Sequence, residues 1–253
     1  GPLSICDLGY DTLFNSMPGG VWSSSVPGVA NIDALSGFYN AVSPGTTTIS
    51  YTVGACASTA VLTVNPYPPA IVGPTMVCQG STITLTNSVP GGTWTSSNTA
   101  LATVGSSTGL VTGVSAGTVT ITYTLGTGCY QTKAITVNAL PPNITGPGTV
   151  CELGNITLSN PSIGGTWSTA SSTASVGASS GVVSGISGGA ALISYTLSST
   201  GCSATRTVTV NSLPVITGPS ALCATATITE SSTAGGVWTS GTTSVATIDV
   251  MSG

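Results

Sequence analysis

Cysteine is the residue type whose spacing in this chain points most directly to chemistry. One set of cysteines stands four residues after the proline of a Gly-Pro pair: Cys6, Cys78, Cys151 and Cys223. A second set follows the first three of these by 50, 51 and 51 residues: Cys56, Cys129 and Cys202. A recurrent pair in a sequence without histidine or a Cys-x-x-Cys motif is typical of disulfides in an exported protein. The cysteines therefore predict a disulfide framework rather than a metal site or a nucleophile.

The spacing leaves two patterns of disulfide connectivity open. Pairing across the linkers, such as Cys56 with Cys78, would join neighbouring repeats. Pairing within repeats would join the following residues: Cys6 to Cys56, Cys78 to Cys129, and Cys151 to Cys202, with Cys223 unpaired because its expected partner falls beyond residue 253. A simple sandwich places the two cysteines of one repeat at opposite ends, which is an objection to the second pattern. We nevertheless expect pairing within repeats, because each loop of about 50 residues would stabilise its own repeat by roughly 4 kcal/mol.

Few other side chains could perform catalysis or bind a metal. Without histidine no Ser-His-Asp or Cys-His relay can form, and the six acidic residues offer no paired carboxylates within one motif. Asp7, Asp11 and Asp33 could form at most one weak calcium site. A covalent Lys–Asn cross-link is disfavoured because Lys133 is the only lysine. We expect no cofactor and no metal, and an enzyme is the class that the sequence favours least.

The charge balance also limits the partners. Charged residues make up 3% of the chain and the net charge is −4. Two basic residues are too few to neutralise the phosphates of nucleic acid or of an anionic membrane surface. No apolar run reaches the roughly 18 residues of a membrane helix, so we expect no membrane insertion. Weak repulsion between copies favours self-association.

The cysteines belong to a repeat of 72 or 73 residues. Gly-Pro pairs mark its start, at Gly1, Gly73, Gly146 and Gly218. A tryptophan recurs in the same register: Trp22, Trp94, Trp167 and Trp238. The period divides the chain into repeats at residues 1–66, 67–139 and 140–212, with a partial fourth at 213–253. The proline-containing linkers are expected to be short and semi-rigid, which predicts an elongated rod.

Short β-strands must position these residues. In the second repeat, residues 82–86 and 118–124 alternate apolar residues with threonine, the period of a half-buried strand. Further strands are expected at 92–97, 100–104, 109–112 and 129–138. No segment has the period of 3.6 that is typical of a helix. About seven strands with a core tryptophan on the third predict an all-β fold of tandem Ig-like sandwiches with essentially no helix.

The second repeat also resembles a known family. The stretch ALATVGSSTGLVTGVSAGTVTITYT at 100–124 is similar to the bacterial Ig-like domain of group 2, of the invasin and intimin type. The flanking MVCQGSTITLT and GCYQTKAITVN resemble the cysteine-bearing Ig-like repeats of large surface proteins of Bacteroidetes-type bacteria. The resemblance covers all the repeats and implies extracellular stalks, adhesins or filaments, without catalytic residues to transfer.

The first repeat departs from the others in its aromatic residues. By alignment, Tyr10 and Phe14 replace threonines that face outward in the second repeat, and Asp11 replaces the inward Ile83. Aromatic residues are enriched at interfaces, so a contact for assembly is one hypothesis, and local repacking around Asp11 is the alternative. The candidate contact residues are Tyr10, Phe14, Phe38 and Tyr39.

Three positions match glycosylation motifs. Asn143 and Asn155 begin Asn-Ile-Thr sequons, and Thr12 lies in an Asp-Thr-Leu motif that resembles the O-linked acceptor of Bacteroidetes. Attached sugars would help to keep a chain with so few charges in solution.

The sequence thus predicts a structural repeat segment of a bacterial extracellular filament or cell-surface adhesin stalk. A glycan- or cell-binding adhesion module is the alternative, and spacer domains of a large secreted enzyme are a further one. Self-association is the expected partnership in the first case.

Overall fold

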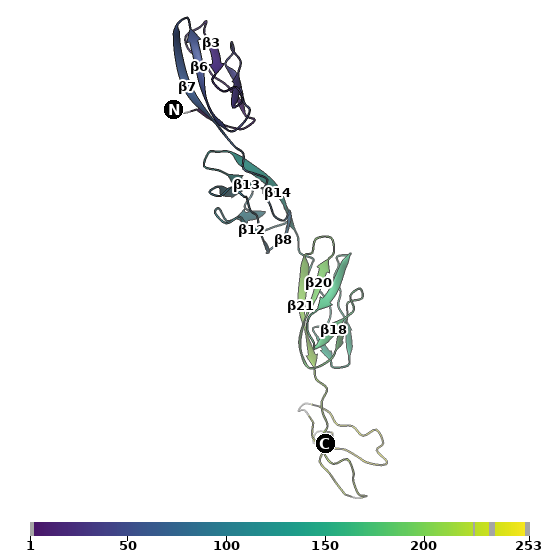
Figure 1. Cartoon of the computed structure of the whole chain (residues 1–253). Coiled ribbons are helices and arrows are strands. Elements are labelled where there is room, and N and C mark those ends of the chain that lie inside the picture. The colour runs from purple at the N-terminus through teal and green to yellow at the C-terminus, as the bar shows by residue number, and fades with distance from the viewer. Residues whose placement is uncertain (1–2, 225, 233–235, 251–253) are drawn as a thin grey trace. The chain divides into compact units, whose positions relative to one another are not determined.

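The fold consists of successive bodies of β-strands (Figure 1). This computed structural model describes residues 3–224, 226–232 and 236–250, so the Gly1-Pro2 pair, Gly235 and the last three residues of the predicted fourth repeat lie outside the described residues. The chain divides into two compact units, Gly1–Leu140 and Pro141–Gly253, and each is described by itself.

The first unit begins with a seven-stranded body. Its strands are β1 (Leu3–Cys6), β2 (Tyr10–Thr12), β3 (Val21–Ser24), β4 (Ala30–Ile32), β5 (Phe38–Ala41), β6 (Gly45–Val53) and β7 (Cys56–Asn65). They form a four-stranded sheet in the order β1-β7-β6-β3 and a three-stranded sheet in the order β2-β5-β4. The first strand runs parallel to the last, with Cys6 opposite Asn65.

A second body in the same unit has the same layout. Its strands are β8 (Met76–Cys78), β9 (Thr82–Thr84), β10 (Thr93–Ser96), β11 (Ala102–Val104), β12 (Leu110–Gly113), β13 (Gly117–Thr124) and β14 (Tyr130–Asn138). The sheets have the orders β10-β13-β14-β8 and β11-β12-β9. Strand β8 again pairs in parallel with the last strand, β14.

The second unit contains a third body of this kind. Its strands are β15 (Thr149–Cys151), β16 (Asn155–Thr157), β17 (Gly165–Thr169), β18 (Ala174–Val176), β19 (Val182–Gly185), β20 (Gly189–Leu197) and β21 (Ser203–Asn211). The sheet orders are β15-β21-β20-β17 and β16-β19-β18. After Asn211, the described residues form one isolated bridge, Thr217 with Ser231, and no strand.

Two sheets of four and three strands in this order define an Ig-like β-sandwich, which confirms the predicted fold class. The described residues contain no helix, and hence none long and apolar enough to cross a membrane. The predicted strands of the second repeat are present with ends shifted by a few residues. The short first strand, β8, was not predicted, because its three residues carry too little pattern to stand out.

Alternation of side chains explains how the sheets enclose a core. In β13, Val119, Ile121 and Tyr123 are buried, while the threonines between them face away. Trp94 on β10 pairs with Tyr123 across the sheet, and their ring centroids lie 4.6 Å apart. Gly92 precedes this tryptophan because a Cβ there would strike the Tyr123 ring. The recurrent Gly-Gly-x-Trp motif is thus a packing motif.

Candidate functional site

The joint between successive repeats carries the most specific side-chain chemistry in the chain. The two basic residues of the chain occupy equivalent positions, four residues after the second cysteine of their repeats. Lys133 Nζ donates a hydrogen bond to the carbonyl oxygen of Ile71 at 3.1 Å. Arg206 donates from Nη1 to the carbonyl oxygen of Ile144 at 2.8 Å, and from Nη2 to that of Gly146 at 2.6 Å. Each cation therefore holds the linker that leads into its own repeat.

The linker isoleucines belong to the core of the repeat that follows them. Ile71 is 6% exposed and Ile144 is 4% exposed, and each joins a cluster of eleven buried residues. The next residue extends the sheet edge, since Val72 exchanges two backbone hydrogen bonds of 2.9 Å with Thr86. An asparagine side chain completes the hold, because Asn87 Nδ2 donates to the Pro69 carbonyl at 2.6 Å. We give the name linker clamp to three contacts together: the hydrogen bond from the cation on the last strand, the backbone pairing of Val72 with Thr86, and the hydrogen bond from Asn87.

The third repeat builds the same clamp from equivalent residues. Thr145 exchanges backbone hydrogen bonds of 2.9 Å with Ser159, and Asn160 Nδ2 donates to the Pro142 carbonyl at 2.6 Å. The clamped segment therefore has the pattern Pro-x-Ile-x-Gly in both repeats.

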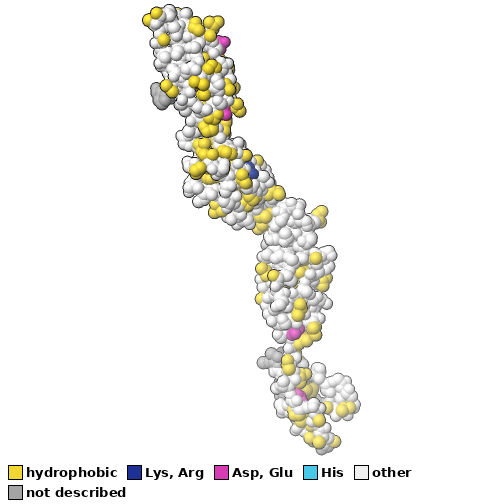
Figure 2. Space-filling model, viewed as in Figure 1, with side chains coloured by type: hydrophobic (Ala, Val, Ile, Leu, Met, Phe, Trp, Pro, Cys, Tyr) yellow, Lys and Arg dark blue, Asp and Glu magenta, His cyan; other side chains and the backbone are white. Residues whose placement is uncertain are grey.

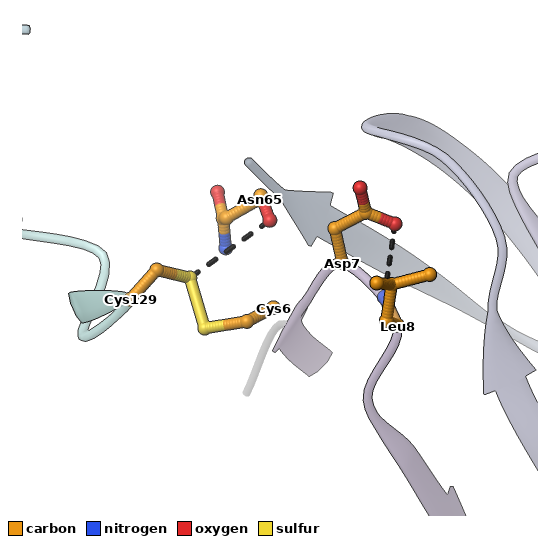
Figure 3. Close-up of a disulfide and its surroundings, with 5 residues drawn as sticks. All are labelled: Cys6, Asp7, Leu8, Asn65 and Cys129. Carbon is orange, nitrogen blue, oxygen red and sulfur yellow. Dashed lines mark hydrogen bonds between the residues drawn. A yellow bond between two sulfur atoms is a disulfide. The ribbon is translucent and has the colours of Figure 1, made fainter. Parts of the chain in front are cut away.

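A disulfide joins the first repeat to the second. Cys6 and Cys129 are bonded, with Cα atoms 5.7 Å apart and 123 residues between them in sequence (Figure 3). The Asn65 carbonyl oxygen accepts a hydrogen bond from Asp7 N at 2.8 Å and lies 3.8 Å from Cys129 Sγ. The second of these is a contact only, because a disulfide sulfur carries no hydrogen.

The predicted pairing within repeats is therefore wrong. The parallel pairing of β1 with β7 places Cys6 beside Asn65, where the first repeat ends, whereas Cys56 begins β7. Asn65 lies nine positions after Cys56 along an extended strand, a span of about 30 Å, and bonded cysteines need Cα atoms within roughly 7 Å. The predicted pairs Cys78–Cys129 and Cys151–Cys202 fail as well, because Cys129 bonds to Cys6 and Cys151 is free.

The other cysteines differ in their bonding. Cys78 and Cys202 are also disulfide-bonded. Cys56, Cys151 and Cys223 are free and exposed.

The tryptophans differ in burial between repeats. Trp94 and Trp167 are 5% and 7% exposed, in the cores of the second and third repeats. Trp22 is half-buried against the core of the first, and Trp238 is half-buried outside any strand. A tyrosine ring packs against the tryptophan in each of the first three repeats. Its hydroxyl also holds the turn that precedes the tryptophan: Tyr123 Oη donates to the Val89 carbonyl at 2.6 Å and accepts from Gly92 N at 2.8 Å.

The aromatic residues of the first repeat do not form one exposed set. Tyr10 and Phe38 face solvent with ring centroids 6.0 Å apart, and Phe14 is 88% exposed. Tyr39 is 3% exposed because successive residues of β5 face opposite sides, so its assignment as a contact is wrong. Burial raises the pKa of the Tyr39 hydroxyl, and the Asp11 carboxylate, on the residue paired with it across the sheet, adds to the shift.

Asp33 holds a turn of the first repeat. Asp33 Oδ1 accepts hydrogen bonds from Ser36 Oγ at 2.7 Å, Ser36 N at 2.8 Å and Leu35 N at 3.2 Å, which lower its pKa. Asp11 is exposed, where the inward Ile83 stands half-buried in the second repeat. Within the part of the chain that is described, no three metal-binding side chains come together.

The predicted glycosylation positions differ in accessibility. Asn143 and Asn155 are exposed, whereas Thr12 is half-buried at the end of β2. Modification at these residues stays a prediction.

Comparison with known proteins supports the family resemblance for one repeat. Residues 71–137 match the family model of the bacterial Ig-like domain (group 2), as the resemblance predicted. No curated protein matches the chain.

Several solved structures are similar to the chain. Domains 1–6 of the surface layer protein SbsC align with 83% of it at 15% identity, with a TM-score of 0.27, and the chain covers 39% of that structure. Invasin, a bacterial integrin-binding protein, aligns with 80% at 16% identity and a TM-score of 0.38, and 54% of its chain is covered. Domains EC1-3 of Drosophila N-cadherin align with 84% at 10% identity and a TM-score of 0.27, with 98% covered.

Proposed function

We propose that the chain is a load-bearing repeat segment of a bacterial extracellular filament or cell-surface adhesin stalk. The observation that carries this proposal is the disulfide between Cys6 and Cys129. Disulfides persist in oxidising compartments outside the cytoplasm, which supports an extracellular location. The bacterial Ig-like model that matches the second repeat supports the bacterial origin.

The disulfide provides a covalent path for tension. A pull on the N-terminal end passes from Cys6 directly to Cys129 and then along β14 into the next linker. The bond bypasses the 122 residues between the two cysteines and fixes the distance from Cys6 to Cys129 while it is intact. Neither sandwich of the first unit can then be extended between these two cysteines.

Single-molecule force spectroscopy tests this role. Oxidised chain held at its two ends should yield no extension from the loop, and reduction should release up to roughly 400 Å of contour at about 3.3–3.6 Å per residue. The Cys56→Ser variant is the control, because Cys56 is free and its removal leaves the path intact. Release of the loop length under oxidising conditions would refute a load-bearing role for the bond.

A glycan- or cell-binding module is the second candidate function. The exposed ring pair of Tyr10 and Phe38 favours it, because aromatic faces suit apolar contact with a ligand. Saturable binding of sugars or host cells, lost in the Tyr10→Thr variant, would support this candidate over a purely structural role.

A further inference from the structure

The outer face of the three-stranded sheet in the first repeat differs from its counterparts in the other repeats. Tyr10 of β2 and Phe38 of β5 project from this face, 73% and 45% exposed, with ring centroids 6.0 Å apart. The equivalent positions of the second repeat hold Thr82 and Leu110, and the third repeat has no aromatic residue at either position. The ring pair is therefore specific to the first repeat.

This face is also open to solvent in the second repeat, although another repeat precedes it in the same unit. Thr82 is exposed there, and Leu110 is 44% exposed. A preceding repeat therefore leaves this face of the sandwich accessible.

Two asparagines lie beside the rings on the same face. Cross-strand pairing places Asn40 opposite Tyr10, and Asn31 opposite Asn40. Paired residues of neighbouring strands point to the same side of a sheet, so the three side chains share the outer face. Both asparagines are exposed, and neither side chain has a hydrogen-bond partner among the described residues. Each amide is therefore available both to donate and to accept.

The charge of the first repeat limits which ligand this face can hold. Residues 1–66 contain three acidic residues and no basic one. Figure 2 shows hydrophobic and acidic side chains, and no basic one, on the visible surface of this repeat. Asp11 and Asp33 are exposed, and Asp33 lies beside Phe38, because its backbone N–H donates to the Phe38 carbonyl at 2.7 Å. These carboxylates repel an anionic ligand and tolerate a neutral one.

We propose that a neutral saccharide binds to this ring face, which consists of Tyr10, Asn31, Phe38 and Asn40. A sugar ring has an apolar face of C–H groups and a rim of hydroxyls. The C–H groups pack on the aromatic rings, whose faces carry negative partial charge, and the hydroxyls exchange hydrogen bonds with the two amides. The inference rests on the second candidate function and names its ligand class and its residues.

The surroundings of the rings favour a sugar over a second copy of the chain. The centre of a protein interface is depleted of charged residues, and its aromatic residues have largely apolar neighbours. Here the neighbours of the rings are Asn31, Asn40 and the Asp33 carboxylate. Such polar groups suit the hydroxyls of a saccharide.

Calorimetric titration of the full-length chain tests the ligand class. The neutral probes are the hexasaccharides of glucose, mannose and N-acetylglucosamine, and a hyaluronate hexasaccharide is the anionic probe. We expect saturable binding of at least one neutral probe and weaker binding of hyaluronate. No binding of any neutral probe, or equal or tighter binding of hyaluronate, would overturn the proposal.

Substitution by the residues of the second repeat tests the ring face. Tyr10→Thr introduces the residue found at position 82 and should weaken binding roughly threefold to tenfold, as loss of one aromatic contact would. Asn31→Thr introduces the residue found at position 103 and should weaken binding by a similar factor. Tyr130→Thr is the matched control, because Tyr130 is 53% exposed on a strand of the other repeat. Equal affinities of Tyr10→Thr and Tyr130→Thr would contradict the ring face as the site.

The second repeat offers a gain-of-function variant. Thr112 pairs with both Thr82 and Thr103, as Asn40 pairs with Tyr10 and Asn31. The combined substitutions Thr82→Tyr, Thr103→Asn, Leu110→Phe and Thr112→Asn therefore rebuild the ring face there. This variant should bind two saccharides per chain instead of one. A single bound saccharide, in a variant that keeps the thermal unfolding midpoint, would contradict the proposal.

Sedimentation and cell adhesion separate the remaining outcomes. The unmodified chain and Tyr10→Thr should sediment alike, whereas self-association lost in the variant would assign the rings to a contact between copies and overturn the saccharide. Adhesion to host cells without binding of any neutral probe would uphold the second candidate function and overturn the ligand proposed for it. Force spectroscopy measures the disulfide alone, so failure of the load-bearing role is distinguishable from both.

Discussion

Removing the disulfide between the first two repeats should lower the stability of the first repeat substantially. The bond closes a sequence separation of 123 residues, for which chain entropy gives about 5 kcal/mol when the whole loop unfolds. When the second repeat stays folded, the restrained chain runs only from Cys6 to the linker after Asn65. That loop of about 60 residues gives roughly 4 kcal/mol, so Cys6→Ser should lower the free energy of unfolding of the first repeat by this amount.

Hydrogen exchange followed by mass spectrometry on the full-length chain resolves this loss repeat by repeat. A loss of about 4 kcal/mol corresponds to a fall in protection of roughly a thousandfold for amides that exchange through opening of the first repeat. Cys56→Ser is the control, because an exposed free cysteine should change stability by less than about 0.5 kcal/mol. Equal losses in both variants would refute the reasoning, since they are what a bond between Cys6 and Cys56 predicts.

Three further predictions concern single side chains. Lys133→Met removes the donor to the Ile71 carbonyl and should destabilise the second repeat by about 1–3 kcal/mol in urea unfolding, whereas an unchanged midpoint would mean that water replaces the lysine. Tyr123→Phe loses both hydrogen bonds of the hydroxyl to the preceding turn and should cost about 1–3 kcal/mol in the same assay. Burial and the nearby Asp11 carboxylate raise the pKa of Tyr39 above its ordinary value of 10.0. The neutral hydroxyl therefore contributes folding stability that is fully present below pH 10.0 and is lost as the pH rises through the raised pKa of the folded state. Tyr39→Phe should flatten that alkaline loss in a pH series of thermal unfolding, and a loss of the same size in the variant would assign it to another group.

The sequence predicted the sandwich well because strand periodicity and turn residues are local signals. Alternation in the 118–124 stretch identified β13, and the recurrent Gly-Gly-x-Trp identified a packing position in the first three repeats. Disulfide connectivity is a long-range property, and it depended on one feature that local patterns do not show. The first strand, of only three or four residues, pairs in parallel with the last strand, which moves each first cysteine to the far end of its repeat.

The linker clamp could be detected in the sequence from the positions of the basic residues, although not from their number. The chain has only two basic residues, and by composition they indicate only a shortage of charge. Both nevertheless lie four residues after the second cysteine of their repeat. This equivalent position indicates that the two residues have the same role. The sequence alone does not show this task, because the carbonyl oxygen that Lys133 binds belongs to a residue 62 positions earlier in the chain.

Strand order explains how the second repeat would resist a pull on its two ends once the bond from Cys6 to Cys129, which bypasses β8, is reduced. Within the second repeat the chain enters at β8 and leaves at β14, and these two strands are parallel neighbours. A pull on both ends therefore slides one strand along the other and loads their hydrogen bonds together, rather than opening them one at a time. Lys133 adds a charged contact from β14 to the linker just before β8, so it resists the same sliding motion. In the first repeat Ala60 stands at this position, so the parallel pairing of β1 with β7 has no equivalent cation to support it.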